Sequence, residues 1–139
     1  IMLALSALAG WERTYGGSGT DYGFSVTQTS DGGYIVAGVT DPFGADYYDV
    51  YLVKTDAVGD TIWTRTYGGS NYDEVYSVAQ TSDGGCIVAG FTYSFGAGDR
   101  AVYLVKTDSL GYTGIEESAQ TVPTAPTLRC WPNPGGPTI

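Results

Sequence analysis

Four short stretches in the first half of the chain carry the residue pattern of β-strands. They span residues 24–28, 34–39, 50–55 and 61–67. The first alternates large and polar side chains with period two, which places successive side chains on opposite faces of a strand. The others are rich in Val, Ile, Thr and Tyr, which favour an extended backbone. Turn residues separate the stretches, so we predict four antiparallel strands joined by tight turns.

The same pattern occurs a second time, without a gap. Trp11 corresponds to Trp63, and this offset of 52 residues holds for three blocks. The paired blocks are 11–18 with 63–70, 25–38 with 77–90, and 50–56 with 102–108. The chain therefore contains two tandem units, 11–62 and 63–112. The first unit opens with a lone copy of the fourth strand, Trp11 to Tyr15, and the second unit ends with its third strand.

A unit of four antiparallel strands in roughly fifty residues is typical of a β-propeller blade. We predict an all-β fold of two tandem four-stranded antiparallel propeller-type blades, with a repeat of kelch-like length. Two blades do not close a ring, because propellers typically contain about four to eight. The domain of residues 10–112 is therefore expected to associate with copies of itself or to have further blades. A ring would place the Trp11 strand in a partner's last sheet, whereas open stacking would form a filament.

The segments outside the repeats indicate export. Residues 1–9 are an apolar run that is too short for a membrane-spanning helix, which needs about 20 residues. The run ends in the small-x-small pattern Ala7-Leu8-Ala9, which signal peptidases recognise. We interpret it as the remnant of a secretory signal peptide, with the start of a buried strand or helix as the alternative. Residues 113–127 mix Glu, Ser, Thr and Pro and are predicted to be a linker.

The repeated blocks resemble a known kind of repeat. Trp-x-Arg-Thr-Tyr-Gly-Gly-Ser, Gln-Thr-Ser-Asp-Gly-Gly-(Tyr/Cys)-Ile-Val-Ala-Gly and Val-Tyr-Leu-Val-Lys-Thr-Asp are similar to propeller-type repeats of secreted bacterial and archaeal proteins. Within residues 128–139, Trp-Pro-Asn-Pro is similar to the opening of the C-terminal sorting domain of type IX secretion substrates, although Gly135 and Gly136 depart from it. The resemblance implies a secreted or cell-surface protein and no particular activity.

Charge and composition exclude several functions. The 139 residues contain 15 acidic and 6 basic side chains, a net charge of −9, and no histidine. This charge repels nucleic acid, and the lack of histidine removes the commonest catalytic base and zinc ligand. An enzyme would have to use carboxylates. Two cysteines are too few for a disulfide scaffold; Cys86 is predicted to be a buried thiol, and a bridge to Cys130 is left open.

Two sets of acidic residues are candidate sites. The repeated Ser-Asp-Gly-Gly is interpreted as a hairpin turn, with a calcium-binding or catalytic carboxylate as the alternative. Its residues are Asp31, Gly32, Gly33, Asp83, Gly84 and Gly85. The acidic loop of the first unit is a candidate for a weak calcium site, because Ca²⁺ takes oxygen ligands. Its residues are Asp41, Asp46 and Asp49, which the second unit replaces with Tyr93, Gly98 and Ala101. No other cofactor is expected.

Aromatic side chains supply the remaining candidates. Trp11 and Trp63 are predicted to lie in the core between blades, with carbohydrate stacking as the alternative. The loop tyrosines fit either role and are candidates for ligand binding; they are Tyr22, Tyr47, Tyr48, Tyr72 and Tyr93. Four basic side chains recur at equivalent positions and are expected to pair with Asp56, Asp108 or Asp21; they are Arg13, Arg65, Lys54 and Lys106.

Two functions follow from these patterns. The first is a non-catalytic extracellular structural or binding module for adhesion, surface display or assembly. The alternative is a glycan-binding or carboxylate-based glycan-active propeller. A glycosidase needs two carboxylates that face each other at roughly 5 to 10 Å. Expected partners are further copies or blades, glycans and surface proteins, with no nucleic acid and no transmembrane span.

Overall fold

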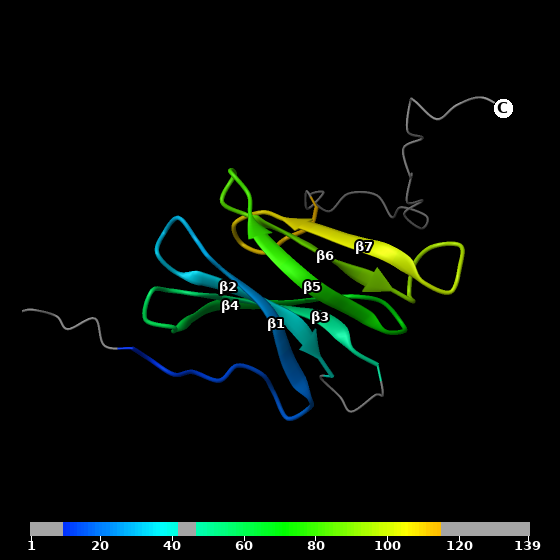
Figure 1. The fold of residues 1–139 in the computed structure, drawn as a ribbon, viewed down its shortest axis with the longest axis horizontal. Helices are drawn as coiled ribbons and strands as arrows, with labels where there is room; N and C mark the ends of the chain where they lie inside the picture. The colour runs from blue at the N-terminus through cyan, green and yellow to red at the C-terminus, as the bar shows by residue number, and fades with distance from the viewer. Residues whose placement is uncertain (1–9, 42–46, 115–139) are drawn as a thin grey trace, which may run out of the picture.

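The computed structural model describes residues 10–41 and 47–114, which form two antiparallel β-sheets (Figure 1). Sheet A has the order β1-β2-β3-β4, and sheet B has the order β5-β6-β7. The strands are β1 (Asp21–Gln28), β2 (Tyr34–Thr40), β3 (Asp49–Thr55), β4 (Thr61–Tyr67), β5 (Asp73–Gln80), β6 (Cys86–Thr92) and β7 (Ala101–Thr107). The predicted all-β antiparallel fold is confirmed, and the two sheets form no closed ring.

Several predictions concern residues outside the described ranges. These are the signal peptide at 1–9, the sorting-like segment at 128–139, all of the linker beyond Gly114, Asp46 and Cys130. No helix in the ranges that the structure describes has the length and apolarity of a membrane crossing.

The 52-residue repeat of the sequence is also a repeat of strand pairing. Tyr34 pairs with Thr55 in sheet A, and Cys86 pairs with Thr107 in sheet B. The first hairpin of each sheet has a register shift at equivalent positions, after Gly23 and after Val75. The sheets therefore have the same backbone design. They differ in strand number, because no strand in the described ranges pairs with the free side of β7.

Tight turns join the first two strands of each sheet. Gly32 and Gly84 have φ angles of 85° and 83°, which L-residues with a Cβ rarely adopt. Thr29 and Gly33 close the first turn with a backbone hydrogen bond of 2.9 Å, and Thr81 and Gly85 close the second at 3.0 Å. The Ser-Asp-Gly-Gly segments thus lie in hairpin turns at one end of the strands.

The core lies between the two sheets. β5 of sheet B packs across β1 and β2 of sheet A. The buried residues of this core are Ile35, Ala37, Val50, Leu52, Trp63, Val75, Val78, Cys86, Val88 and Val105. Cys86 is a free, buried thiol, and burial raises its pKa above the usual value. Trp63 is only 9% exposed, whereas Trp11 is 41% exposed. The structure thus separates two tryptophans that the sequence treats alike.

The lone fourth-strand copy, residues 11–17, is not a strand in the structure. It lies along sheet A on the side away from sheet B (Figure 1). Trp11 Nε1 donates to the carbonyl of Ala57 at 3.2 Å, and the hydroxyl of Tyr15 donates to the carbonyl of Gly59 at 2.7 Å. Both contacts are made to the turn between β3 and β4. Residues 11–17 therefore have a defined position without a strand partner.

Candidate functional site

Eight aromatic side chains form one unbroken row of ring contacts, which we call the aromatic row. Neighbouring ring centroids lie 5.2 to 6.3 Å apart. In order along the row, the residues are Tyr47, Tyr72, Tyr48, Tyr22, Phe24, Tyr76, Phe91 and Tyr93. The structure thus brings together all five tyrosines that the sequence singles out, although they come from both repeats.

The sheet order explains why these rings are accessible. β1 and β5 are edge strands of their sheets and lie against each other. Tyr22 and Phe24 project from β1 and Tyr76 projects from β5, and all three are about half exposed. Tyr48 and Tyr72 stand just before β3 and β5 and join the row at the end of the sheets. Rigid strands and short connections therefore hold the rings in place.

Sequence reasoning missed three members of the aromatic row, Phe24, Tyr76 and Phe91. Phe24 and Tyr76 occupy equivalent positions in the first strand of each repeat. Alternation alone predicts that large residues of such a strand face a core. The signal that would expose them is the edge position of β1 and β5, which only the strand order reveals.

Polar groups accompany the rings at one end of the row. The hydroxyl of Tyr76 donates to a carboxylate oxygen of Glu74 at 2.9 Å, and this hydrogen bond raises the pKa of Tyr76. The guanidinium of Arg100 lies 5.1 Å from the centre of the Phe91 ring. An extended ligand with apolar faces and hydroxyl groups would find ring faces for stacking and both donors and acceptors for hydrogen bonds.

The acidic residues of the predicted calcium loop do not form a described cluster. Asp46 lies outside the described residues, and Asp49 lies beside Asp73 of the next repeat, against Gly68. Burial and the neighbouring charge of Asp73 raise the pKa of Asp49. Within residues 10–41 and 47–114, no three or more His, Cys, Asp or Glu side chains are grouped to hold a metal. Calcium binding stays a prediction.

Asp73 stabilises the turn that precedes β5, a role that we did not predict from the sequence. It is fully buried, and its Oδ2 accepts hydrogen bonds from the amide of Gly69 at 2.8 Å and from the hydroxyl of Ser94 at 2.6 Å. In the first repeat, Asp21 accepts a hydrogen bond from the amide of Gly17 at 3.0 Å in the same way. Each aspartate therefore holds the Gly-Gly turn that precedes it.

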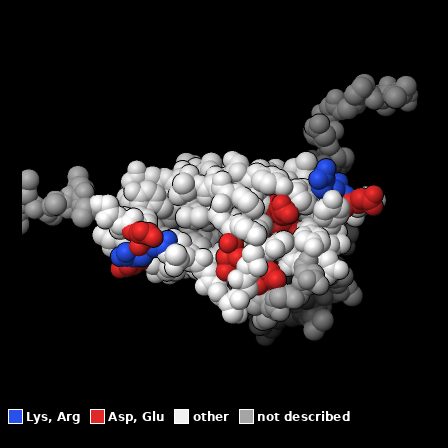
Figure 2. Space-filling view, turned by 60° about the horizontal axis from the view of Figure 1, so that its bottom comes forward, with Lys and Arg blue, Asp and Glu red and all other residues white. Residues whose placement is uncertain are grey.

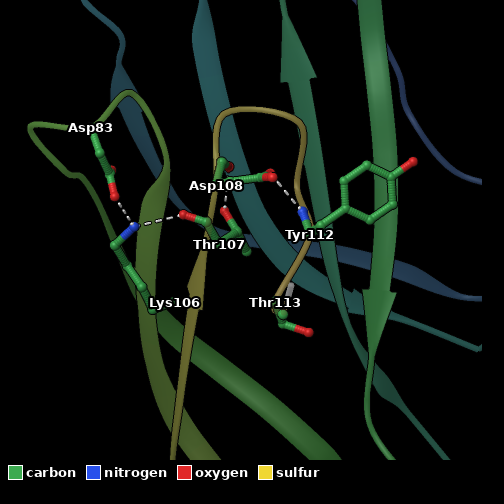
Figure 3. Close-up of a pocket in the computed structure, with 7 residues that line it drawn as sticks. Asp83, Lys106, Thr107, Asp108, Tyr112 and Thr113 are labelled. Atoms are coloured by element: carbon green, nitrogen blue, oxygen red, sulfur yellow. Dashed lines mark hydrogen bonds and ion pairs between the residues drawn. The ribbon is translucent and has the colours of Figure 1, made fainter. Parts of the chain in front are cut away.

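An open hollow of about 630 Å³ lies beyond the end of β7 and contains two aspartates (Figure 3). Lys106 Nζ donates to Asp83 at 2.6 Å and to the carbonyl of Thr107 at 2.8 Å. The ammonium of Lys106 holds the pKa of Asp83 well below its usual range. Asp108 accepts hydrogen bonds from the amides of Leu110 and Tyr112. Both carboxylates therefore stabilise turns.

The predicted lysine partners are wrong. Lys54 pairs with Asp31 at 2.9 Å, and Lys106 pairs with Asp83. The physical reason is that Asp56 and Asp108 accept the backbone amides of their own turns. The turn aspartate and the third-strand lysine of each repeat thus form one ion-paired unit, which links the two hairpins of a sheet.

Comparison with known proteins adds no family to this description. No family model matches the sequence, and no curated protein matches it significantly.

Proposed function

We propose that this chain is a non-catalytic extracellular repeat module that binds neutral glycans on its aromatic row. One observation carries the proposal: eight rings contributed by two repeats form a single connected surface, most of it exposed. Contiguous exposed aromatic surface is uncommon on soluble domains and marks interaction sites.

The chemistry of the row favours sugars over other ligands. A pyranose presents C–H groups on its faces and hydroxyl groups at its rim. Tyrosine matches this division, because its ring is apolar and its hydroxyl donates and accepts hydrogen bonds. A row of rings suits a chain of sugar units better than a compact ligand. The exposed rings keep a fixed spacing because strands carry several of them, which reduces the entropy lost on binding.

Charge favours neutral glycans over acidic ones. The chain has a net charge of −9. Figure 2 shows acidic side chains without basic neighbours in the middle of one face, whereas basic side chains lie at its two ends. Sulfated or uronate-rich polymers would be repelled by such a surface, and the repulsion would be strongest at low ionic strength.

The extracellular part of the proposal rests on sequence patterns. Residues 1–9 have the pattern of a signal peptide, and residues 128–139 resemble the start of a type IX sorting domain. Two stacked antiparallel sheets are consistent with propeller-type repeats. We propose that the module is exported and displayed at the cell surface, where a glycan-binding row would serve adhesion.

Affinity electrophoresis in gels that contain soluble neutral polysaccharides tests this function. Xylan, mannan and a mixed-linkage glucan are suitable probes, and a sulfated polysaccharide serves as the charged comparison. We expect a neutral polymer to retard the chain. Replacing Tyr22 and Tyr76 together with alanine removes two rings and is expected to weaken binding roughly tenfold, at about 0.5–1.5 kcal/mol for each ring.

Tyr112→Ala is the matched control, because Tyr112 is also exposed but contacts Arg65 outside the row. It should leave the retardation unchanged. Equal loss in both variants, or no retardation by any neutral polymer, would contradict glycan binding on the row. Release of reducing ends from a retained polymer would contradict the non-catalytic part of the proposal.

A further inference from the structure

The outer face of sheet B, which points away from sheet A, is apolar and open to solvent. Its centre is formed by Ile87, Val102, Leu104 and Lys106. Val102 is 79% exposed and Leu104 is 61% exposed, whereas their equivalents Val50 and Leu52 are 0% exposed. The equivalents are covered because sheet B packs on that face of sheet A. Equivalent residues are therefore buried between the sheets in the first repeat and exposed to solvent in the second.

The outer face of sheet A carries the complementary surface, which is bare toward β1, whereas residues 11–17 lie on the rest of this face and Val53 is buried there. Val26 is 62% exposed there, whereas its equivalent in sheet B, Val78, is 8% exposed and lies in the core. The contact between the two sheets joins the face of sheet A that carries Leu52 to the face of sheet B that carries Val78. The equivalent of each face lies on the outside of the other sheet and makes no such contact in the single chain. Two surfaces that fit each other but lie on opposite sides of a chain define a head-to-tail contact between copies.

The free edge of β7 has no partner strand within the described ranges. The chain nevertheless contains a segment with the sequence of that strand. β3 pairs with β4, and the equivalent side of β7 has no partner within the described ranges. Residues 11–17 have the fourth-strand sequence, and residues 115–139 contain no further copy of it. Unpaired edge strands accept an added strand through their free backbone groups.

Residues 11–17 already lie where such an addition requires. Trp11 and Tyr15 donate to Ala57 and Gly59 of sheet A. In β4, Trp63 donates to the carbonyl of Ser109 at 3.1 Å and Tyr67 donates to the carbonyl of Gly111 at 2.6 Å. These contacts are equivalent under the 52-residue offset. Residues 11–17 therefore contact sheet A in the same way as β4, the fourth strand of sheet A, contacts sheet B.

We propose that the chain assembles head to tail, with the outer face of sheet B packed on the outer face of sheet A of a second copy. Residues 11–17 of that copy then pair with β7 as its fourth strand. The register follows from sheet A, where Val50 pairs with Tyr67, Leu52 with Arg65 and Lys54 with Trp63. The expected pairs are Val102 with Tyr15, Leu104 with Arg13 and Lys106 with Trp11, each second residue being from the second copy.

The surface along β7 has room for this strand. The hollow of Figure 3 adjoins a second hollow of about 510 Å³, and both are lined by Lys106 and Thr113. Tyr67 and Leu104 line the second hollow. In sheet A, Trp63 lies opposite Lys54, and that lysine is buried. Trp11 of the second copy would cover Lys106 in the same way.

Light scattering behind size exclusion, over a range of concentrations of the full chain, tests whether copies associate. We expect a mass above 14.6 kDa that corresponds to a ring or to a distribution of open assemblies. Either form contains the proposed contact. A mass of one chain at every concentration, up to the highest that stays soluble, would overturn the proposal.

Leu104→Lys tests which surface is used. Leu104 is exposed in the single chain, so the variant should fold, whereas the assembly would bury an added charge and should dissociate to single chains. Leu110→Lys is the control, because Leu110 and its equivalent Val58 are both more than half exposed and lie outside the contact between sheets. An assembly that survives Leu104→Lys, or that both variants dissolve equally, would overturn the proposal.

Cross-linking tests the register. One chain carries Arg13→Cys and the other carries Leu104→Cys, both with Cys130→Ser; Cys86 stays because it is buried. Residues directly opposite in a sheet lie within reach of a disulfide. Mild oxidation of the mixture should link the two chains, and neither chain should link to itself. Absence of the mixed product would exclude this register. The dissociated Leu104→Lys variant should still be retarded by a neutral glycan, because its aromatic row is unchanged. Failure of assembly and failure of glycan binding can therefore be distinguished.

Discussion

Sheets A and B have nearly the same sequence in two different settings. Leu52 and Leu104 occupy equivalent positions in the third strand, yet only Leu52 is buried. Lys54 is buried as well, whereas Lys106 is exposed. Two features of the setting differ. The face of sheet A that carries Leu52 is covered by sheet B, and sheet A has a fourth strand. The equivalent face of sheet B is uncovered, and sheet B has no fourth strand within the described ranges.

Some features of a repeat are local, whereas others depend on the neighbouring sheet. The turn aspartate binds the third-strand lysine in both sheets, at 2.9 Å in sheet A and 2.6 Å in sheet B. The hairpin turns and the register shift are also the same. Only the burial of the apolar face changes. In a single chain the second repeat therefore packs through one face only, and the face that carries Val102 and Leu104 contributes no packing between sheets.

Replacing the two equivalent leucines should separate the sheets most clearly. Leu52→Ala leaves a cavity in the core and should lower the free energy of unfolding by about 2–5 kcal/mol. Leu104→Ala in the dilute, dissociated chain should change it by less than about 0.5 kcal/mol, because an exposed side chain loses little packing. Urea unfolding followed by tryptophan fluorescence measures both. Equal costs in the dilute chain would mean that Leu104 is also buried, which would contradict the difference between the two sheets.

The turn aspartate of sheet A should have a smaller, pH-dependent effect. Asp31 accepts hydrogen bonds from Thr29, Lys54 and the amide of Gly33, and these hold its pKa well below the usual value of 3.8. Its carboxylate therefore stabilises the fold above about pH 4, and this contribution is lost as the pH falls toward the lowered pKa. Asp31→Ala should cost about 1–2 kcal/mol at neutral pH, which is modest because Asp31 is largely exposed.

Unfolding curves at pH 7 and at successively lower pH measure this difference. The gap between the unmodified chain and Asp31→Ala should narrow below about pH 4. Asp83→Ala serves as the comparison and should have the smaller effect at neutral pH, because it leaves an exposed rather than a buried lysine without a partner. A gap that is constant over this pH range would show that the carboxylate charge does not stabilise the fold.

The smallest expected effects are equal in the two sheets. Gly32→Ala and Gly84→Ala each place a Cβ at a positive φ, although neither Cβ would come closer than 3.6 Å to another atom. The cost is therefore conformational, about 1–2 kcal/mol for a left-handed residue, less the backbone entropy that alanine removes from the unfolded chain. Thermal unfolding should show equal shifts. A larger shift for Gly32→Ala would mean that the turns also depend on the packing between sheets.

Much of the fold is predictable from local patterns, and the candidate surface only in part. Strands form in the predicted stretches of both repeats, because alternation and turn residues act within a hairpin, but the lone fourth-strand copy at residues 11–17 is not a strand. The partners of Lys54 and Lys106 were not predictable, because Asp31 and Asp56 are equally plausible in sequence and only the turn geometry separates them. The aromatic row was not predictable either, because it forms only where tyrosines of both repeats come into contact, and that contact depends on how sheet B packs on sheet A.

The two repeats, their strands and their turns can be read from the sequence, because they depend on the backbone preferences of a few neighbouring residues. Which of two equivalent residues is buried, which strands are edges and which rings touch depends on how the two sheets pack. The physical reason is that burial and ring contacts depend on the surface that faces a residue, and that surface comes from another part of the chain. For Leu52 that surface is sheet B. For Leu104 we assign it to sheet A of a second copy.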